Sequence, residues 1–130
     1  MAFDQHSHHR AARNWLDGLP AEAGCWFCRL SQMGFLRLAT NPRANPRQTL
    51  TFSQAWQVYD NFLLDPRIGF ANEPSGLDAT WRTLTQTRGF SPHVWNDAYL
   101  AGFAAAGGYE VVTFDAGFSQ YPGVRLSLLT

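Results

Sequence analysis

Hydrophobic positions along the chain alternate between the spacing of amphipathic helices and the short apolar runs typical of strands. The helical spacing predicts helices over residues 8–19, 31–40, 53–63, 77–87 and 92–106. Apolar or β-branched runs predict strands over residues 25–28, 68–71, 109–114 and 123–129. Ser31 and Ser53 are the expected caps of the second and third helices. This alternation predicts an α/β sandwich with a largely parallel sheet flanked by helices.

Length and composition narrow the class of protein. A chain of 130 residues is long enough to bury one substantial core, so we expect a single domain over residues 1–130. No apolar run approaches the roughly 20 residues that a membrane span needs. The first ten residues are polar and do not resemble a signal peptide. We therefore expect a cytoplasmic protein with no membrane partner.

Charge is balanced overall but uneven along the chain. The formal net charge is zero, and the basic residues are all arginine. No acidic residue lies between Glu22 and Asp60, whereas four arginines do: Arg29, Arg37, Arg43 and Arg47. A planar guanidinium can bind two phosphate oxygens at once. The segment is either a basic face for nucleic acid or a set of ordinary solvated arginines.

The only cysteines form a C-x-x-C pair, Cys25 and Cys28. In a thioredoxin-like site this motif follows a strand and opens a helix, so a redox enzyme is one alternative function. Here Cys25–Cys28 has the pattern of a strand. Because positions i and i+3 of a strand point to opposite faces, the two thiols are expected to be structural rather than paired.

Two carboxylates are placed where a metal site would need them. Asp97 lies near the start of the helix predicted over 92–106, beside its apolar face, and Asp115 directly follows the strand predicted over 109–114. Ligands of open α/β sheets bind at the carboxyl ends of strands, and hard oxygen ligands suit Mg²⁺ or Mn²⁺. The alternative is that Asp97 pairs with an arginine and Asp115 begins a turn.

Four stretches in order along the chain resemble the PIN-domain toxins of VapC type. They are HHRAARNWL at 8–16, FLRLATNP at 35–42, NDAYL at 96–100, and TFDAGF at 113–118 with YPGVR at 121–125. The resemblance implies a PIN-like three-layer sandwich and an acidic cluster that holds Mg²⁺ or Mn²⁺. It also implies endonucleolytic cleavage of RNA, a small VapB-like antitoxin partner and a homodimer.

The family's site residues carry over only in part. Asp97 matches the acid of the family's D-A-x-L motif, and Asp115 matches the acid of its T-F-D motif. Where the helix after the family's second strand commonly offers a glutamate, the nearest residue here is the uncharged Gln32, whose amide oxygen can ligate or orient water but adds no negative charge. Arg37 and Arg43 are the candidate contacts to the RNA backbone.

The family's first strand, which carries another acidic metal ligand, has no counterpart after Met1. Its absence would leave a sheet position open and weaken metal binding. Two interpretations follow: an active metal-dependent ribonuclease toxin, or a catalytically impaired PIN-like domain that keeps only antitoxin or RNA binding.

Overall fold

The computed structural model describes residues 14–44, 46–86, 91–113 and 116–129, which form two compact units that divide between Asn72 and Glu73. The first unit contains β1 (Cys25–Phe27), α2 (Arg29–Ala39), α3 (Phe52–Leu63) and β2 (Ile68–Phe70). The second contains α4 (Leu77–Gln86), α5 (Val94–Gly107), β3 (Glu110–Thr113), the 3₁₀ helix η1 (Ala116–Gln120) and β4 (Arg125–Leu128). Among the described residues, no helix is long and apolar enough to span a bilayer.

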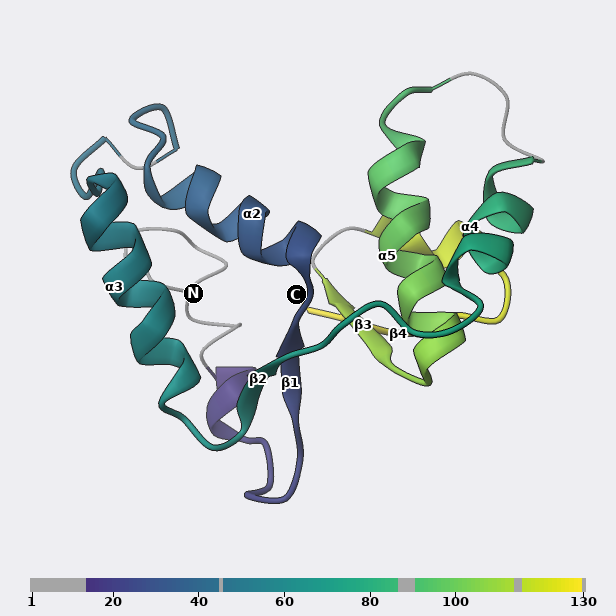
Figure 1. Cartoon of the computed structure of the whole chain (residues 1–130), viewed down its shortest axis with the longest axis horizontal. Coiled ribbons are helices and arrows are strands. Elements are labelled where there is room, and N and C mark those ends of the chain that lie inside the picture. Colours follow the sequence, from purple (N-terminus) through teal and green to yellow (C-terminus); the bar gives the residue numbers. More distant parts are fainter. Residues whose placement is uncertain (1–13, 45, 87–90, 114–115, 130) are drawn as a thin grey trace. The chain divides into compact units, whose positions relative to one another are not determined.

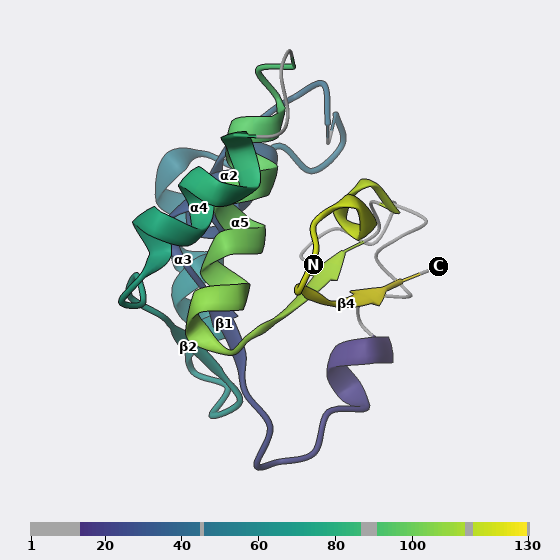
Figure 2. The same ribbon diagram turned by 90° about the vertical axis from the view of Figure 1, so that its right-hand side faces the viewer.

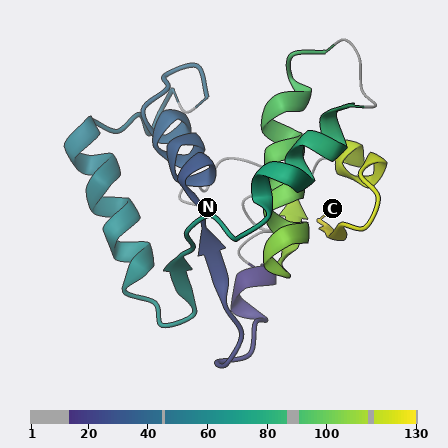
Figure 3. The same ribbon diagram turned by 45° about the vertical axis from the view of Figure 1, so that its right-hand side comes forward.

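In the first unit, β1 and β2 form a parallel pair in the register Cys25↔Ile68 to Phe27↔Phe70. Helices α2 and α3 belong to the same unit, and each contacts a strand of this pair (Figures 1 and 3). Phe27 packs its ring against Tyr59 of α3, with centroids 5.1 Å apart. Phe35 of α2 contacts Phe62 of α3 at 5.5 Å. These aromatic contacts hold the two helices and β1 together.

Two glycines, one before β1 and one within β2, make room for one tryptophan. Trp26, the middle residue of β1, is 53% exposed, and its ring lies against the backbone of Gly24 and Gly69. A Cβ atom would come within 2.7 Å of the indole at Gly24 and within 2.6 Å at Gly69, closer than real Cβ contacts allow. A side chain at either position would therefore displace the ring.

The starts of α2 and α3 correct two expectations. Helix α2 begins at Arg29, with Cys28 as its N-cap, so Ser31 is the third residue of the helix; its hydroxyl accepts the Cys28 N–H at 2.9 Å. Helix α3 is capped by Thr51 rather than Ser53, in a reciprocal capping box with Gln54 at 3.1 and 2.9 Å. The Ser31 hydroxyl accepts the N–H of the N-cap residue from inside α2, whereas the Thr51 hydroxyl accepts an N–H of the first turn of α3, so a serine near a helix start is not always its cap.

Arg67 joins the start of β2 to the segment that precedes β1. Residues 14–17 are helical, in agreement with the expected first helix, whose earlier residues lie outside the described part of the chain. The Arg67 guanidinium donates to the Leu16 carbonyl at 2.6 Å and to both carboxylate oxygens of Asp65, at 3.1 and 2.8 Å. One side chain therefore links segments far apart in sequence.

Replacing Asp65 by Asn is expected to lower stability near neutral pH, with an effect that disappears in acid. Hydrogen bonds from the Arg67 side chain, and then from its backbone N–H, lower the Asp65 pKa from 3.8 to about 2. A depressed pKa contributes stability above the unfolded-state value of 3.8, and this contribution is lost as the pH falls toward 2. Urea unfolding of both proteins as a function of pH measures the effect. A difference that stays constant down to pH 2 would contradict the assignment.

In the second unit, β3 and β4 pair in parallel from Glu110↔Arg125 to Thr113↔Leu128. Helix α5 packs against both α4 and β3. Gly108 ends α5 with φ of 73°, in the left-handed region that favours glycine, and the chain then turns back into β3 (Figure 2). The strands expected over 109–114 and 123–129 are confirmed as the shorter β3 and β4, with Phe114 outside the described residues.

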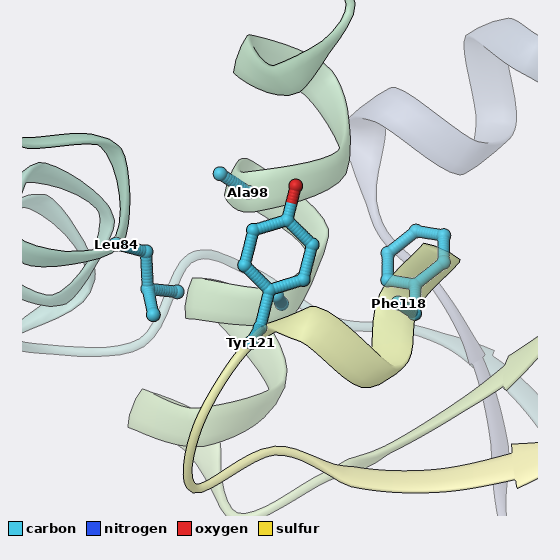
Figure 4. Packing of buried hydrophobic residues seen from close by; sticks show 5 residues of the cluster. Leu84, Ala98, Phe118 and Tyr121 are labelled. Atoms are coloured by element: carbon cyan, nitrogen blue, oxygen red, sulfur yellow. The ribbon is translucent and has the colours of Figure 1, made fainter. Parts of the chain in front are cut away.

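The core of the second unit is built around small residues of α5. Ala98 and Ala101 are completely buried, and they pack with Leu84 of α4, Phe118 of η1 and Tyr121 (Figure 4). At Gly102 a Cβ atom would lie 3.3 Å from the Trp81 backbone, so the small residue lets α4 and α5 approach closely. The apolar face predicted for this helix is therefore confirmed, although α5 begins at Val94 rather than at Pro92.

Candidate functional site

Asp97 lies in the first turn of α5 and is half-buried. Its helical neighbours Ala98 and Ala101 are fully buried, so the Asp97 side chain lies at the edge of the core. A carboxylate in such a place needs a compensating partner because losing water destabilises its charge. The free N–H groups of the first helical turn contribute part of that compensation.

The strand that precedes Asp115 is present where the sequence places it. β3 ends at Thr113, whose carbonyl accepts the N–H of Leu129 at 2.8 Å. Asp115 itself lies outside the described residues. Its role as the second metal ligand therefore stays a prediction that rests on its position directly after β3.

Gln32 is buried, with 6% of its surface exposed. Its Oε1 accepts a hydrogen bond of 2.6 Å from Nη1 of Arg29. Tyr59 is likewise buried; burial raises the Tyr59 pKa, and the Gln32 side chain opposes the shift. An oxygen that already accepts from a guanidinium is a poor ligand for a second cation, which argues against direct metal ligation by Gln32. That ligation stays a prediction.

The two arginines predicted to contact RNA are exposed. Arg37 lies in the last turn of α2, where a cation also stabilises the helix dipole. Arg43 follows α2, and its backbone N–H donates to Asn41 Oδ1 at 2.9 Å. These positions are compatible with binding a nucleic acid, and equally with ordinary solvated arginines.

Hard oxygen ligands are the donors that a Mg²⁺ or Mn²⁺ site would require. In residues 14–44, 46–86, 91–113 and 116–129, no group of three or more His, Cys, Asp or Glu side chains is arranged to hold a metal. Asp97 has the donor chemistry that such an ion prefers, and it lies in the first turn of α5. Its predicted partner Asp115 is outside the described residues. The pair therefore fits a divalent ion by the chemistry of its carboxylates and by its position in the sequence.

A pocket of about 350 Å³ opens in the second unit beside the start of α4. Its lining includes Glu73, Asp78, Trp81 and Tyr99, and Asp97 is not part of it. Glu73 accepts a hydrogen bond of 2.6 Å from the Tyr99 hydroxyl, and Asp78 pairs with Arg82 at 2.7 Å. Both carboxylates of this pocket therefore have partners in the protein.

The cysteines do not have the arrangement of a thioredoxin-like redox site. Cys25 begins β1, whereas Cys28 caps α2 and is buried, and both are free thiols. A redox-active first cysteine needs a helix N-terminus and a lowered pKa, but burial raises the pKa of the Cys25 thiol. The expectation that the cysteines are structural agrees with this geometry, although Cys28 belongs to the start of α2 rather than to the strand.

Comparison with known proteins settles the family. A model of the PIN domain matches residues 1–124. The chain is 47% identical to the ribonuclease VapC41 of Mycobacterium tuberculosis over 133 aligned positions, which cover 99% of this chain and 91% of the relative. The chain belongs to the PIN-domain family, among its VapC members.

Other relatives of this PIN-domain protein extend the comparison. It is 30% identical to the ribonuclease VapC38 of the same organism, an alignment that covers 100% of the chain and 91% of the relative. The fold is similar to a crystal structure of VapBC2 from Rickettsia felis bound to a DNA fragment from their promoter. The TM-score is 0.70 at 16% identity, with 95% of this chain and 88% of that chain covered. The PIN-type α/β fold expected from the sequence is therefore confirmed.

Proposed function

We propose that this PIN-domain protein is a metal-dependent endoribonuclease and the toxin of a type II toxin–antitoxin module. The observation that carries the proposal is the 47% identity to the ribonuclease VapC41, which extends over 99% of the chain. The half-buried Asp97 at the start of α5 supports it, because this is the position of the family's acidic helix motif. The cytoplasm is the proposed location, since RNA is the proposed substrate.

Asp97 and Asp115 are the residues proposed to hold Mg²⁺ or Mn²⁺, each through carboxylate oxygens. A divalent ion in such a site supplies activation of water and neutralisation of the charge that develops on a phosphodiester. The protein's own contribution is to present Asp97 from a helix whose inward face is packed. Ala98 and Ala101 are fully buried in the packed core, and this close packing holds the helix in place.

A small VapB-like antitoxin and a second copy of this chain are the proposed protein partners. The similar structure from Rickettsia felis is that of VapBC2, which supports an antitoxin of this kind. We also propose that both compact units belong to one domain, because the PIN-domain match runs through both of them.

The second candidate function is a PIN-like domain that binds its partners without cleaving RNA. The buried Gln32 favours it, since this side chain is uncharged and its Oε1 is engaged by Arg29. A site with fewer carboxylates binds a divalent cation more weakly. Activity of the chain therefore depends on whether the remaining acidic residues hold the metal.

Metal removal separates the two candidates. The purified chain is expected to cleave single-stranded RNA with Mn²⁺ or Mg²⁺, and to lose that activity in excess EDTA because the carboxylates alone cannot activate water. Fragments of a labelled RNA, resolved by electrophoresis, measure the reaction, and added Mn²⁺ should restore it. RNA binding without cleavage at any Mn²⁺ concentration would instead favour the non-catalytic domain.

A further inference from the structure

One of the four arginines between Glu22 and Asp60 is held in a defined place. Arg29, the first residue of α2, is exposed, yet two contacts fix its guanidinium. Nη1 donates to Oε1 of the buried Gln32 at 2.6 Å. The central carbon Cζ lies 4.8 Å from the centroid of the Phe70 ring, a cation–π geometry.

The support beneath Arg29 is itself rigid. Gln32 is 6% exposed and Tyr59 is 3% exposed. Tyr59 packs against the ring of Phe27, with centroids 5.1 Å apart. The Gln32 side chain that holds the guanidinium is therefore itself buried, whereas the guanidinium lies at the surface.

Arg29 also lies at the end of the sheet where α/β proteins bind ligands. It comes just after the carboxyl end of β1, and Phe70 is the last residue of β2, the parallel partner of β1. The carboxyl ends of parallel strands meet at one edge, and this edge is the usual place for a bound ligand in open α/β sheets. The figures show β1 leading directly into α2 at this point (Figures 1 and 3).

No carboxylate neutralises this guanidinium within the described part of the chain, where the ion pairs are Arg67 with Asp65 and Arg82 with Asp78. Of its five N–H donors, one is used by Gln32. The remaining donors of the planar fork match a phosphate group. Because the side chain is already ordered, less conformational entropy is lost on binding than at a freely rotating surface arginine.

We propose that Arg29 is a phosphate-binding residue, pre-oriented by Gln32 and Phe70, that holds the backbone of the RNA substrate. This inference rests on the proposed ribonuclease function and assigns Gln32 a positioning role. It differs from the assignment to Arg37 and Arg43, whose side chains have no such anchor among the described residues. The contact recognises a phosphodiester and not a base, so it is independent of RNA sequence.

The test is equilibrium binding of a fluorescein-labelled single-stranded RNA to the full chain in EDTA, measured by anisotropy at several salt concentrations. Arg29→Gln is expected to weaken binding about 10-fold. The slope of log K against log salt should fall by about 0.7, the value for one lost phosphate contact on a single strand. Arg29→Lys keeps the charge but loses the fork, so it should keep the wild-type slope while binding less tightly.

Arg82→Gln is the matched control, because it removes one exposed arginine that is already paired with Asp78. It should leave both the affinity and the slope unchanged. Equal salt slopes for Arg29→Gln and Arg82→Gln would overturn the proposal, as would an absence of RNA binding by the wild type. Thermal unfolding of each variant shows whether it remains folded.

Failure of this inference can be told apart from failure of the proposed function. Cleavage of RNA with Mn²⁺, combined with normal binding by Arg29→Gln, would refute the Arg29 contact alone. Salt-dependent binding that requires Arg29, without cleavage at any metal concentration, would refute the enzyme and leave the contact standing.

Discussion

Replacing Asp97 by Asn is expected to reduce Mn²⁺-dependent RNA cleavage by more than about 100-fold, since even groups that only support a metal ligand are worth 10–100-fold. The substitution keeps the shape of the side chain and removes its negative charge. Asn is therefore a weaker ligand for a divalent ion in the same space. The measurement is the single-turnover rate of RNA cleavage at saturating Mn²⁺. A variant that cleaves at the wild-type rate would refute the proposed site.

A matched control lies on the neighbouring helix of the same unit. Asp78 occupies the first turn of α4, as Asp97 does in α5, but it is exposed and forms an i,i+4 ion pair with Arg82 at 2.7 Å. Asp78→Asn should cleave RNA like the wild type. Exposed pairs of this kind contribute about 0–1 kcal/mol to stability. Equal losses in both variants would mean that the effect of Asp97→Asn comes from general negative charge or folding rather than from metal binding.

Replacing Tyr59 by Ala is expected to destabilise the protein by about 3–5 kcal/mol, the usual cost of removing a buried aromatic ring. Tyr59 is 3% exposed, and its ring contacts those of Phe27, Phe35 and Trp56 at 5.1, 6.4 and 6.0 Å. The cavity would lie between α3 and the rest of the first unit. Equilibrium unfolding in urea gives the change in free energy.

Tyr59→Phe separates the ring from its hydroxyl. This variant keeps the packing and removes only the buried hydroxyl beside Gln32, so it should cost no more than about 1 kcal/mol. If Tyr59→Ala and Tyr59→Phe were equally destabilised, the hydroxyl rather than the ring packing would dominate at this position. The comparison also shows how far Gln32 depends on Tyr59 for its place.

The periodicity of the sequence predicted which kinds of element follow one another, and this part is confirmed. Strands at 25–27, 68–70, 110–113 and 125–128 fall inside the predicted ranges, and both strand pairs are parallel. The spacing of apolar residues depends on which side of an element faces a core. The type of each element can therefore be predicted without knowledge of tertiary contacts. Helix ends were less accurate, because the serine at position 31 satisfies backbone groups from inside the helix.

Candidate site residues were predictable to different extents. Asp97 could be recognised because it stands beside the inward face of a helix and within a family motif, and the structure places it in the first turn of α5. The role of Gln32 could not be predicted in the same way. Its partner Arg29 is close in sequence, but Gln32 is buried beside Tyr59 of α3, and the exposed Arg29 lies over Phe70 of β2.

By itself the sequence determined the α/β pattern, the PIN-type resemblance and the position of Asp97 on its helix, because each depends on local spacing. Tertiary structure alone decided that Gln32 is a buried anchor and that Arg29 is held over Phe70. The physical reason is that hydrogen bonds and ring contacts between distant segments form only when the strands align. On an isolated helix the i,i+3 pair of Arg29 and Gln32 would be exposed to water, without the burial of Gln32 or the contact of Arg29 with Phe70.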